Sequence, residues 1–337
     1  MGMRYTTFGR TGLRVPELVL GAMTFGEQGG VGAPIEECRR ILDAYAEAGG
    51  NMIDTAINYR GGASEEILGQ IICERDRFVL ATKYTVTRDA ADPNGGGNHR
   101  RNLRLSLETS LRRLRTDHVD IYWVHIWDRH TPIEETMRAL DDAVSAGKVL
   151  YVGISDAPAW VVSRANTLAE WRGWTPFAGL QVPYSLVNRD AERELLPMAE
   201  AYGMAVTAWS PLGGGILTGK YGKSDISEKS RRLDPASLSD RDRSVATAVG
   251  KVADEIGATS AQVALAWTRR RKGVLPILGA RSEAQIRDNL GCLQINLTDE
   301  QAETLEAATG FQRGFPADFI SQTTPWVLGA AAVDMYP

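Results

Sequence analysis

Short apolar runs alternate with longer amphipathic stretches along most of the chain. The apolar runs predict eight strands, at 17–22, 51–54, 77–83, 119–125, 149–155, 177–182, 204–210 and 274–280. The stretches between them predict helices at 35–48, 64–73, 99–114, 133–146, 158–171, 190–202, 242–256 with 259–271, and 282–291. Within the fourth helix, Ile133, Met137, Leu140 and Val144 recur at the spacing of one helical face.

This alternation predicts a (β/α)8 barrel rather than a doubly wound sheet. Strands that are apolar throughout are typical of a parallel sheet buried on both faces, and about eight strand–helix units in roughly 300 residues fit a TIM barrel. A doubly wound fold would carry G-x-G-x-x-G after its first strand, whereas this chain has GAMTFGEQGGVGAP there. We therefore expect residues 1–337 to form a single barrel domain with long loops at the carboxyl ends of its strands.

Two local signals refine the ends of these elements. The opening residues RYTTFGRTGLRV hold a glycine-containing turn between two short strands, which predicts a β-hairpin outside the eightfold repeat that caps the floor of the barrel. Ser64 stands before Glu65 and Glu66, so we expect it to be the N-cap of the second helix.

Composition and charge argue against several classes of function. With a formal charge of −4 and both signs spread along the chain, the protein lacks the basic excess of a nucleic-acid binder. No apolar run reaches about 18 residues, so no membrane span is expected, and the start has no apolar signal core. Cys38, Cys73 and Cys292 are far apart, which argues against a disulfide framework or a metal site and favours a reducing, cytoplasmic location.

Four ionisable side chains follow adjacent strand ends. Asp54 ends the second predicted strand, Lys83 the third and His125 the fourth, while Tyr59 lies in the loop after the second. In a TIM barrel the chemistry sits at the carboxyl ends of the strands, so these four groups should meet in one mouth. Any one of them alone would fit a structural role, but their shared position makes the group a candidate catalytic site.

Nine segments carry a characteristic order and spacing: LVLGAMTFG, MIDTAINY, SEEILG, FVLATK, LRRLRTDHVDIYWVH, VGISD, LQVPYSL, WSPLGGGILTGKY and ILGARSEAQIRDNL. Together they resemble the aldo-keto reductase family over roughly residues 3–309. The resemblance implies a barrel that binds NADPH without a Rossmann domain and reduces carbonyl groups. It also implies a catalytic tetrad of Asp54, Tyr59, Lys83 and His125.

The chemistry of carbonyl reduction gives each of these residues a task. A hydride that reaches the carbonyl carbon leaves negative charge on oxygen, and a tyrosine with a pKa near 10 is a sluggish proton donor at neutral pH. A neighbouring ammonium, Lys83, should lower the pKa of Tyr59, and Asp54 should keep Lys83 charged by pairing with it. His125 should donate a hydrogen bond to the carbonyl oxygen and orient the substrate.

The same resemblance implies where the nicotinamide end of NADPH or NADP+ binds. Trp209 should stack on the ring, and Ser155, Asp156 and Gln181 should bind its carboxamide. Asp156 stands where the family usually has asparagine; an ionised aspartate only accepts hydrogen bonds, so it should accept from the carboxamide NH2. The remaining residues of this predicted subsite are Met23 and Asp54.

Two further groups of residues should bind the rest of the cofactor. The residues predicted at the pyrophosphate, where glycines let backbone N–H groups approach, are Ser210, Pro211, Leu212, Gly213 and Lys220. The residues predicted at the adenosine end are Gly279, Arg281, Gln285, Asp288 and Asn289. Arg281 and the helix start beside it both suit a phosphate, so we expect NADPH to be preferred over NADH.

The substrate pocket is predicted from residues just past the strand ends. Phe25 and Trp127 should form its walls, beside Tyr59 and His125. Arg60 either reaches the mouth, where it would favour anionic or polar substrates, or is simply solvated. The substrate is expected to be a small carbonyl compound, and the sequence does not choose among sugars, quinones, steroids and aromatic aldehydes.

Three long segments bear on how the site is covered. The loop 84–98 helps to set substrate choice, and the charged segment 219–240 is expected to fold over the cofactor. The tail 311–337 contains apolar stretches such as TTPWVLGAA. It either closes the mouth or makes a contact between the subunits of a homo-oligomer.

Two other classes of function stay open from the sequence. The first is a regulatory binding module like the potassium-channel β subunits, but these carry asparagine at the position of His125, so His125 favours an enzyme. The second is a lyase or aldolase that uses Lys83 as a Schiff base. Asp54 argues against it, because a charged lysine is a poor nucleophile.

Overall fold

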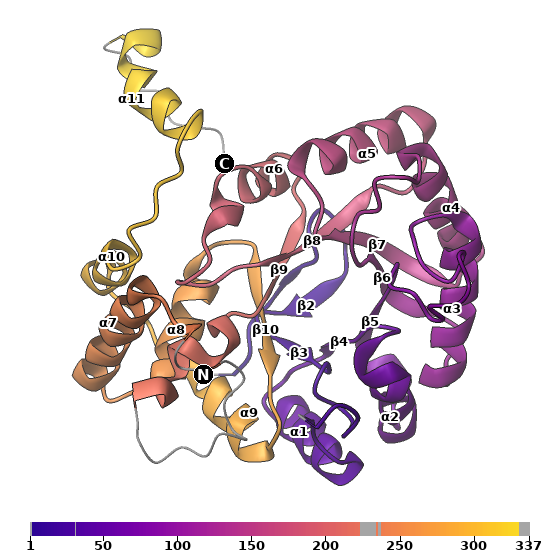
Figure 1. The fold of residues 1–337 in the computed structure, drawn as a ribbon, viewed down its shortest axis with the longest axis horizontal. Helices are drawn as coiled ribbons and strands as arrows, with labels where there is room; N and C mark the ends of the chain where they lie inside the picture. Colours follow the sequence, from indigo (N-terminus) through magenta and orange to yellow (C-terminus); the bar gives the residue numbers. More distant parts are fainter. Residues whose placement is uncertain (1, 31, 223–233, 235–236, 330–337) are drawn as a thin grey trace.

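Eight parallel strands close into a barrel in a computed structural model that describes residues 2–30, 32–222, 234 and 237–329 (Figure 1). Around the barrel the strands run in the order β10-β3-β4-β5-β6-β7-β8-β9. Their bounds are β3 (Val19–Gly21), β4 (Met52–Asp54), β5 (Val79–Tyr84), β6 (Val119–Val124), β7 (Val149–Ser155), β8 (Phe177–Pro183), β9 (Ala205–Trp209) and β10 (Val274–Gly279). The predicted (β/α)8 barrel is confirmed.

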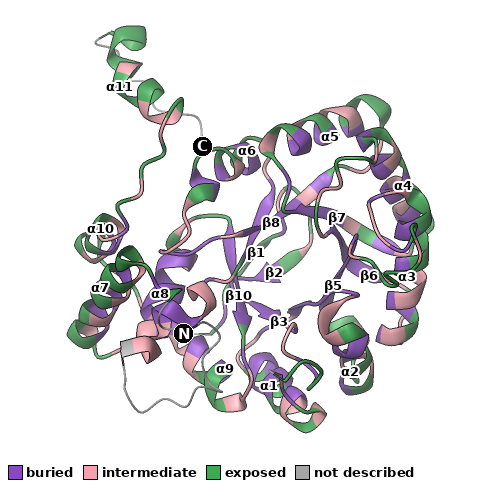
Figure 2. Ribbon diagram, in the orientation of Figure 1, coloured by how far each residue is buried: buried purple, intermediate pink, exposed green. Residues whose placement is uncertain are grey.

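Helices surround the barrel and bury its outer face (Figure 2). Their bounds are α1 (Ile35–Glu47), α2 (Ala63–Ile71), α3 (Arg100–Leu114), α4 (Ile133–Ser145), α5 (Ala159–Arg172), α6 (Leu195–Ala201), α7 (Asp240–Ile256), α8 (Ser260–Arg270), α9 (Glu283–Leu290), α10 (Asp299–Ala307) and α11 (Ala317–Leu328). The helix predicted over 190–202 was wrong in its first half, where a 3-10 turn, Asp190–Glu192, precedes α6.

The N-terminal hairpin closes the floor of the barrel, as predicted. Strands β1 (Tyr5–Thr7) and β2 (Arg14–Pro16) pair antiparallel. Phe8, in the turn between them, is fully buried in a cluster with residues at the starts of barrel strands, among them Val19 and Met52. Its ring meets Trp123 of β6 edge-on, with ring centroids 6.1 Å apart. The interior is therefore packed at this end, and open space remains at the carboxyl ends.

Ser64 does not cap α2, contrary to the prediction. The loop after β4 turns through Arg60, Gly61 and Gly62, whose φ values of 53°, 64° and 103° are left-handed, and α2 begins at Ala63 with Gly62 as its N-cap. Ser64 is therefore buried in the first turn, where its hydroxyl donates to the carbonyl of Ala22 at 2.7 Å. The hydroxyl ties α2 to the end of β3 instead of capping the helix.

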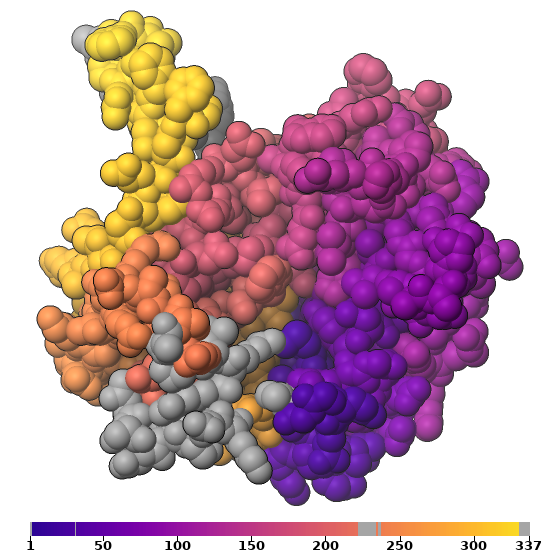
Figure 3. All heavy atoms as spheres, viewed as in Figure 1, coloured from indigo at the N-terminus to yellow at the C-terminus, as the bar shows by residue number. Residues whose placement is uncertain are grey.

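The described part of the tail, residues 311–329, does not close the mouth in this structure. Phe311 packs beneath the guanidinium groups of Arg189 and Arg193, 5.0 and 4.9 Å from its ring centroid. Beyond it, α11 projects away from the barrel (Figures 1 and 3). None of the helices in the described ranges combines the length and the apolar character that crossing a bilayer requires.

Gly153 of β7 provides a test of packing inside the barrel. A Cβ at this position would lie 2.3 Å from two ring carbons of the buried Trp123. Overpacking of this kind costs about 1–3 kcal/mol, so Gly153→Ala should lower the free energy of unfolding by that amount in urea titrations. Gly12→Ala is the control, because a Cβ there would meet no atom within 4 Å. Equal stability of the two variants would contradict the packing described.

Candidate active site

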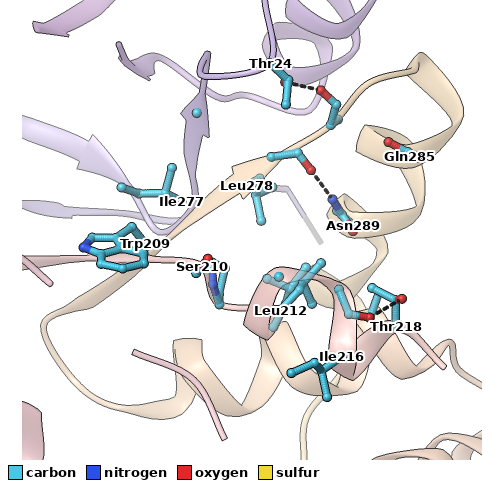
Figure 4. Close-up of a pocket in the computed structure, with 18 of the residues that line it drawn as sticks. Thr24, Trp209, Ser210, Leu212, Ile216, Thr218, Ile277, Leu278, Gln285 and Asn289 are labelled. Carbon is cyan, nitrogen blue, oxygen red and sulfur yellow. Dashed lines mark hydrogen bonds between the residues drawn. The ribbon is translucent and has the colours of Figure 1, made fainter. Parts of the chain in front are cut away.

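A cavity of about 1620 Å³ opens at the carboxyl ends of the barrel strands. Its walls come from residues that follow these strands and from α7, α8 and α9. Figure 4 shows part of this wall, with Trp209 at the end of β9 and Ser210 and Leu212 just after it on one side, and Gln285 and Asn289 of α9 on another. The cavity joins a group of buried ionisable residues to the start of α9.

The predicted tetrad comes together at one end of this cavity. Lys83 on β5 is 0% exposed and donates hydrogen bonds to the Asp54 carboxylate on β4, to the carbonyl of Thr55 at 2.7 Å and to the Tyr59 hydroxyl at 3.2 Å. Asp54, Tyr59 and His125 line the cavity, whereas Lys83 lies behind them. Residues 55–58 lead from the end of β4 to Tyr59, and the left-handed turn at Arg60, Gly61 and Gly62 then leads the chain into α2.

The protonation of this group follows from burial and from pairing. Burial lowers the pKa of Lys83, but the charge of Asp54 and the contact with Tyr59 raise it, and the net shift is upward. Burial raises the pKa of Tyr59, and the opposing charge of Lys83 does not cancel this effect. Lys83 lowers the pKa of Tyr59, as expected, but burial, which the sequence did not reveal, has the larger effect and makes the net shift upward. Tyr59 is a protonated phenol at neutral pH.

His125 is neutral in this environment. Burial, helped by the positive charge of Lys83, lowers its pKa to about 3. Its ring meets that of Tyr59 edge-on, with centroids 5.8 Å apart. Its Nδ1 has no hydrogen-bond partner within the described part of the chain. A neutral imidazole carries one N–H, which can be donated to a carbonyl oxygen placed beside Tyr59.

All but one of the predicted cofactor residues line the same cavity. These are Met23, Asp54, Ser155, Asp156, Gln181, Trp209, Ser210, Pro211, Leu212, Lys220, Gly279, Arg281, Gln285, Asp288 and Asn289. The exception is Gly213, where a Cβ would point at Val187, 2.5 Å away; the cavity wall is made by Gly214 and Gly215 instead. Two adjacent left-handed glycines, with φ of 65° and 101°, expose the backbone there.

Comparison with known proteins gives this arrangement a family. Residues 17–309 match the family model described as "Aldo/keto reductase family". The chain belongs to the aldo/keto reductase family. It is therefore an oxidoreductase of carbonyl and alcohol groups, in a family that uses nicotinamide cofactors.

Three relatives illustrate the similarity. "Probable aryl-alcohol dehydrogenase AAD4" of Saccharomyces cerevisiae is 40% identical, over 85% of this chain and 91% of that protein. "Norsolorinic acid reductase stcV" of Emericella nidulans is 39% identical, over 93% of this chain and 83% of that protein. "Aryl-alcohol dehydrogenase [NADP(+)]" of Phanerodontia chrysosporium is 38% identical, over 90% and 85%.

The nicotinamide cofactor of the aldo/keto reductase family suits the residues that this cavity presents. Trp209 is 37% exposed, so its ring offers a flat surface at the cavity wall. Ser155 Oγ is buried and has no hydrogen-bond partner among the described residues, which leaves it available to a polar ligand group. A Cβ at Gly279 would enter open space in the cavity. These observations fit a long ligand with a planar amide-bearing ring at one end.

Some of the predicted cofactor residues also hold the cavity wall together. Asp288 accepts hydrogen bonds from the Gln262 side chain at 3.0 Å and from the Thr259 hydroxyl at 3.3 Å, which joins α9 to the start of α8. Asn289 donates to the carbonyl of Gly279 at 3.3 Å (Figure 4). Gln181 donates to Asp54 at 3.0 Å, which links the expected carboxamide site to the tetrad.

The two predicted pocket walls, Phe25 and Trp127, are corrected by the structure. Phe25 is fully buried in the core, and Trp127 packs edge-on against Trp160. Neither belongs to the cavity lining, as far as the described residues define it; Val86 and Ile126 do. No signal in the sequence could have chosen Ile126 over Trp127, because side chains in a loop point in directions that follow no fixed period.

Arg60 and the long segments complete the mouth. Arg60 lines the cavity and donates to the carbonyls of Met23 at 3.1 Å and Gln28 at 2.8 Å, so it braces the loop after β3 rather than being merely solvated. Within the predicted cover 219–240, Leu238 lines the cavity, whereas 223–233 and 235–236 lie outside the described residues. Sequence reasoning did not foresee the wall formed by α7 and α8.

The buried pair of Lys83 and Asp54 should matter for stability as well as chemistry. Lys83→Met leaves the Asp54 carboxylate buried without its cation, which typically costs about 3–5 kcal/mol. Chemical denaturation should show this loss, and the double variant Lys83→Met/Asp54→Asn should recover much of it. Lys148→Met is the matched control, because Lys148 forms a half-exposed ion pair with Glu108, and such pairs contribute about 0–1 kcal/mol. A single variant no less stable than this control would contradict the pairing.

Proposed function

We propose that this protein reduces an aldehyde or ketone to an alcohol, reversibly, with NADPH as the hydride donor. The observation that carries the proposal is one continuous cavity. It places Tyr59, held by Lys83 and Asp54, beside His125, and it extends past Trp209 to Arg281 at the start of α9. A carbonyl substrate and a dinucleotide would thus share the cavity, with the reacting groups at the tetrad.

The residues present would hold each part of the cofactor. Trp209 would stack on the nicotinamide, with Ser155, Asp156 and Gln181 at its carboxamide. Gly214 would offer its backbone N–H to the pyrophosphate, and Lys220 lines the cavity near it. The N–H of the adjacent Gly215 donates to the Leu212 carbonyl at 2.9 Å and shapes this turn. When bound, the reduced nicotinamide supplies a hydride to the carbonyl carbon.

The protein's own groups would supply the proton and stabilise the charge. Tyr59, protonated because burial raises its pKa, would donate its proton to the carbonyl oxygen as the hydride arrives. Lys83 would stabilise the phenolate that remains, and Asp54 keeps that lysine charged. Neutral His125 would donate its N–H to the same oxygen. The alcohol then leaves, and solvent returns a proton to Tyr59.

We further propose an aryl aldehyde and its alcohol as the substrate pair. Two of the relatives are named as aryl-alcohol dehydrogenases. Near the tetrad, Met23, Val86, Ile126 and Trp209 line the cavity and offer it apolar surface. A flat aromatic ring would bury its faces against such a surface.

The geometry offers less support for a Schiff-base lyase. A lysine must be neutral to attack a carbonyl, but Lys83 has a raised pKa and no exposed surface. A regulatory binding module like the potassium-channel β subunits is also less well supported, because those proteins carry asparagine at the position of His125.

Removal of the Tyr59 hydroxyl tests the proton donor. Tyr59→Phe should lower kcat for aldehyde reduction by about 10²–10⁴-fold, the usual contribution of general acid catalysis, while NADPH still binds. The assay is loss of NADPH absorbance with aromatic aldehydes, together with fluorescence titration of NADPH. Tyr151→Phe is the control, since Tyr151 of β7 does not line the cavity formed by the described residues. Wild-type turnover by Tyr59→Phe would refute its role.

Arg281 should decide between NADPH and NADH, which differ by one phosphate. A hydrogen bond from a charged group contributes about 1.5–3 kcal/mol, or roughly one to two powers of ten in affinity. Wild type should prefer NADPH by that factor, and Arg281→Ala should lose most of the preference in fluorescence titrations of both cofactors. Arg287→Ala is the control on the same helix, because Arg287 pairs with Glu47 and Glu283. Full discrimination by Arg281→Ala would place the phosphate elsewhere.

A further inference from the structure

Asp156 is a carboxylate held at the cavity wall by the backbone. It follows the last residue of β7 in a left-handed conformation, with φ of 46°. Its side chain is exposed in the cavity and accepts a hydrogen bond from Trp209 Nε1 at 3.2 Å. The carboxylate therefore sits beside the aromatic ring that the proposed function assigns to the nicotinamide.

No charged group that the structure describes near this end of the cavity is paired with the Asp156 carboxylate. Asp54 and Lys83 neutralise each other in a buried ion pair, and His125 is neutral. Arg60 keeps its positive charge, but its guanidinium is held by hydrogen bonds to the carbonyls of Met23 and Gln28 and not by Asp156. Asp156 itself forms no ion pair with any described residue. Its negative charge is thus available to whatever binds against Trp209.

We propose that Asp156 discriminates between the two redox states of the cofactor and favours the oxidised one. The inference rests on the proposed function. The nicotinamide ring is positively charged in NADP+ and uncharged in NADPH, so a nearby carboxylate attracts only the first. A partly screened unit charge several ångströms away changes an affinity by about tenfold.

This preference has a direct consequence for the reaction. In the forward direction two electrons and a proton move as a hydride to the carbonyl carbon, and Tyr59 gives a proton to the oxygen. Positive charge appears on the ring in the same step, and Asp156 stabilises it. Carbonyl reduction within the complex therefore becomes more favourable, while NADP+ is released more slowly than it would be from a neutral site.

Asp156→Asn tests the charge with little other change. Asparagine tolerates the left-handed backbone, and its carbonyl oxygen can still accept from Trp209. Kd values for NADPH by fluorescence and for NADP+ by calorimetry are measured at about pH 8, where an aspartate is ionised. The ratio Kd(NADP+)/Kd(NADPH) should rise about tenfold, chiefly through weaker binding of NADP+. Asp156→Gly, which accepts the same φ, should give the same shift.

Asp254→Asn is the matched control, because Asp254 of α7 lines the same cavity on another wall. Its ratio should equal that of wild type. An unchanged ratio in Asp156→Asn, an equal loss of both affinities, or the same shift in Asp254→Asn would overturn the inference while leaving the proposed function intact. Wild-type protein that binds neither NADPH nor NADP+ would instead refute the proposed function, and the inference with it.

Discussion

A lysine without exposed surface can stay charged only if a carboxylate accompanies it into the barrel, and much of this site depends on that constraint. Lys83 and Asp54 satisfy it from adjacent strands, β5 and β4, whose parallel pairing brings the two side chains together. The ammonium then has one further hydrogen bond to give to a phenol, which Tyr59 accepts. The position of Tyr59, the proposed proton donor, thus follows from the pairing of two strands.

The surrounding structure keeps this arrangement in place. Arg113 of α3 donates to the carbonyl of Ile57 at 2.9 Å and to the buried Glu65 of α2 at 3.3 Å, beneath the loop that carries Tyr59. The Arg113 guanidinium packs against Gly62, where a Cβ would lie 2.3 Å from its Cζ, so a residue with a side chain would displace the guanidinium. At the floor, the turn of the hairpin packs against the starts of the strands, so among the described residues the cavity lies at the carboxyl ends.

The sequence predicted the strands and the residues at their carboxyl ends, because both follow from the apolar pattern. It did not predict which way loop side chains point or how deeply ionisable groups are buried. Apolar runs located the strands, and the shared strand ends brought the tetrad together. Whether Trp127 or Ile126 faces the cavity depends on how the loop after β6 turns, which no pattern encodes. The net pKa shift of Tyr59 was missed because burial outweighs Lys83, and burial becomes visible only once the barrel is closed.

Titration of the Tyr59 phenol tests this account most directly. The phenolate signal is followed by ultraviolet difference spectroscopy between the wild-type protein and Tyr59→Phe, without cofactor. Burial should place the pKa of Tyr59 above the ordinary tyrosine value of about 10, and Lys83→Met should raise it further, since the lysine opposes burial. Ionisation below that value in wild type, or an unchanged midpoint in Lys83→Met, would contradict the claim that Lys83 and burial together set the pKa of Tyr59.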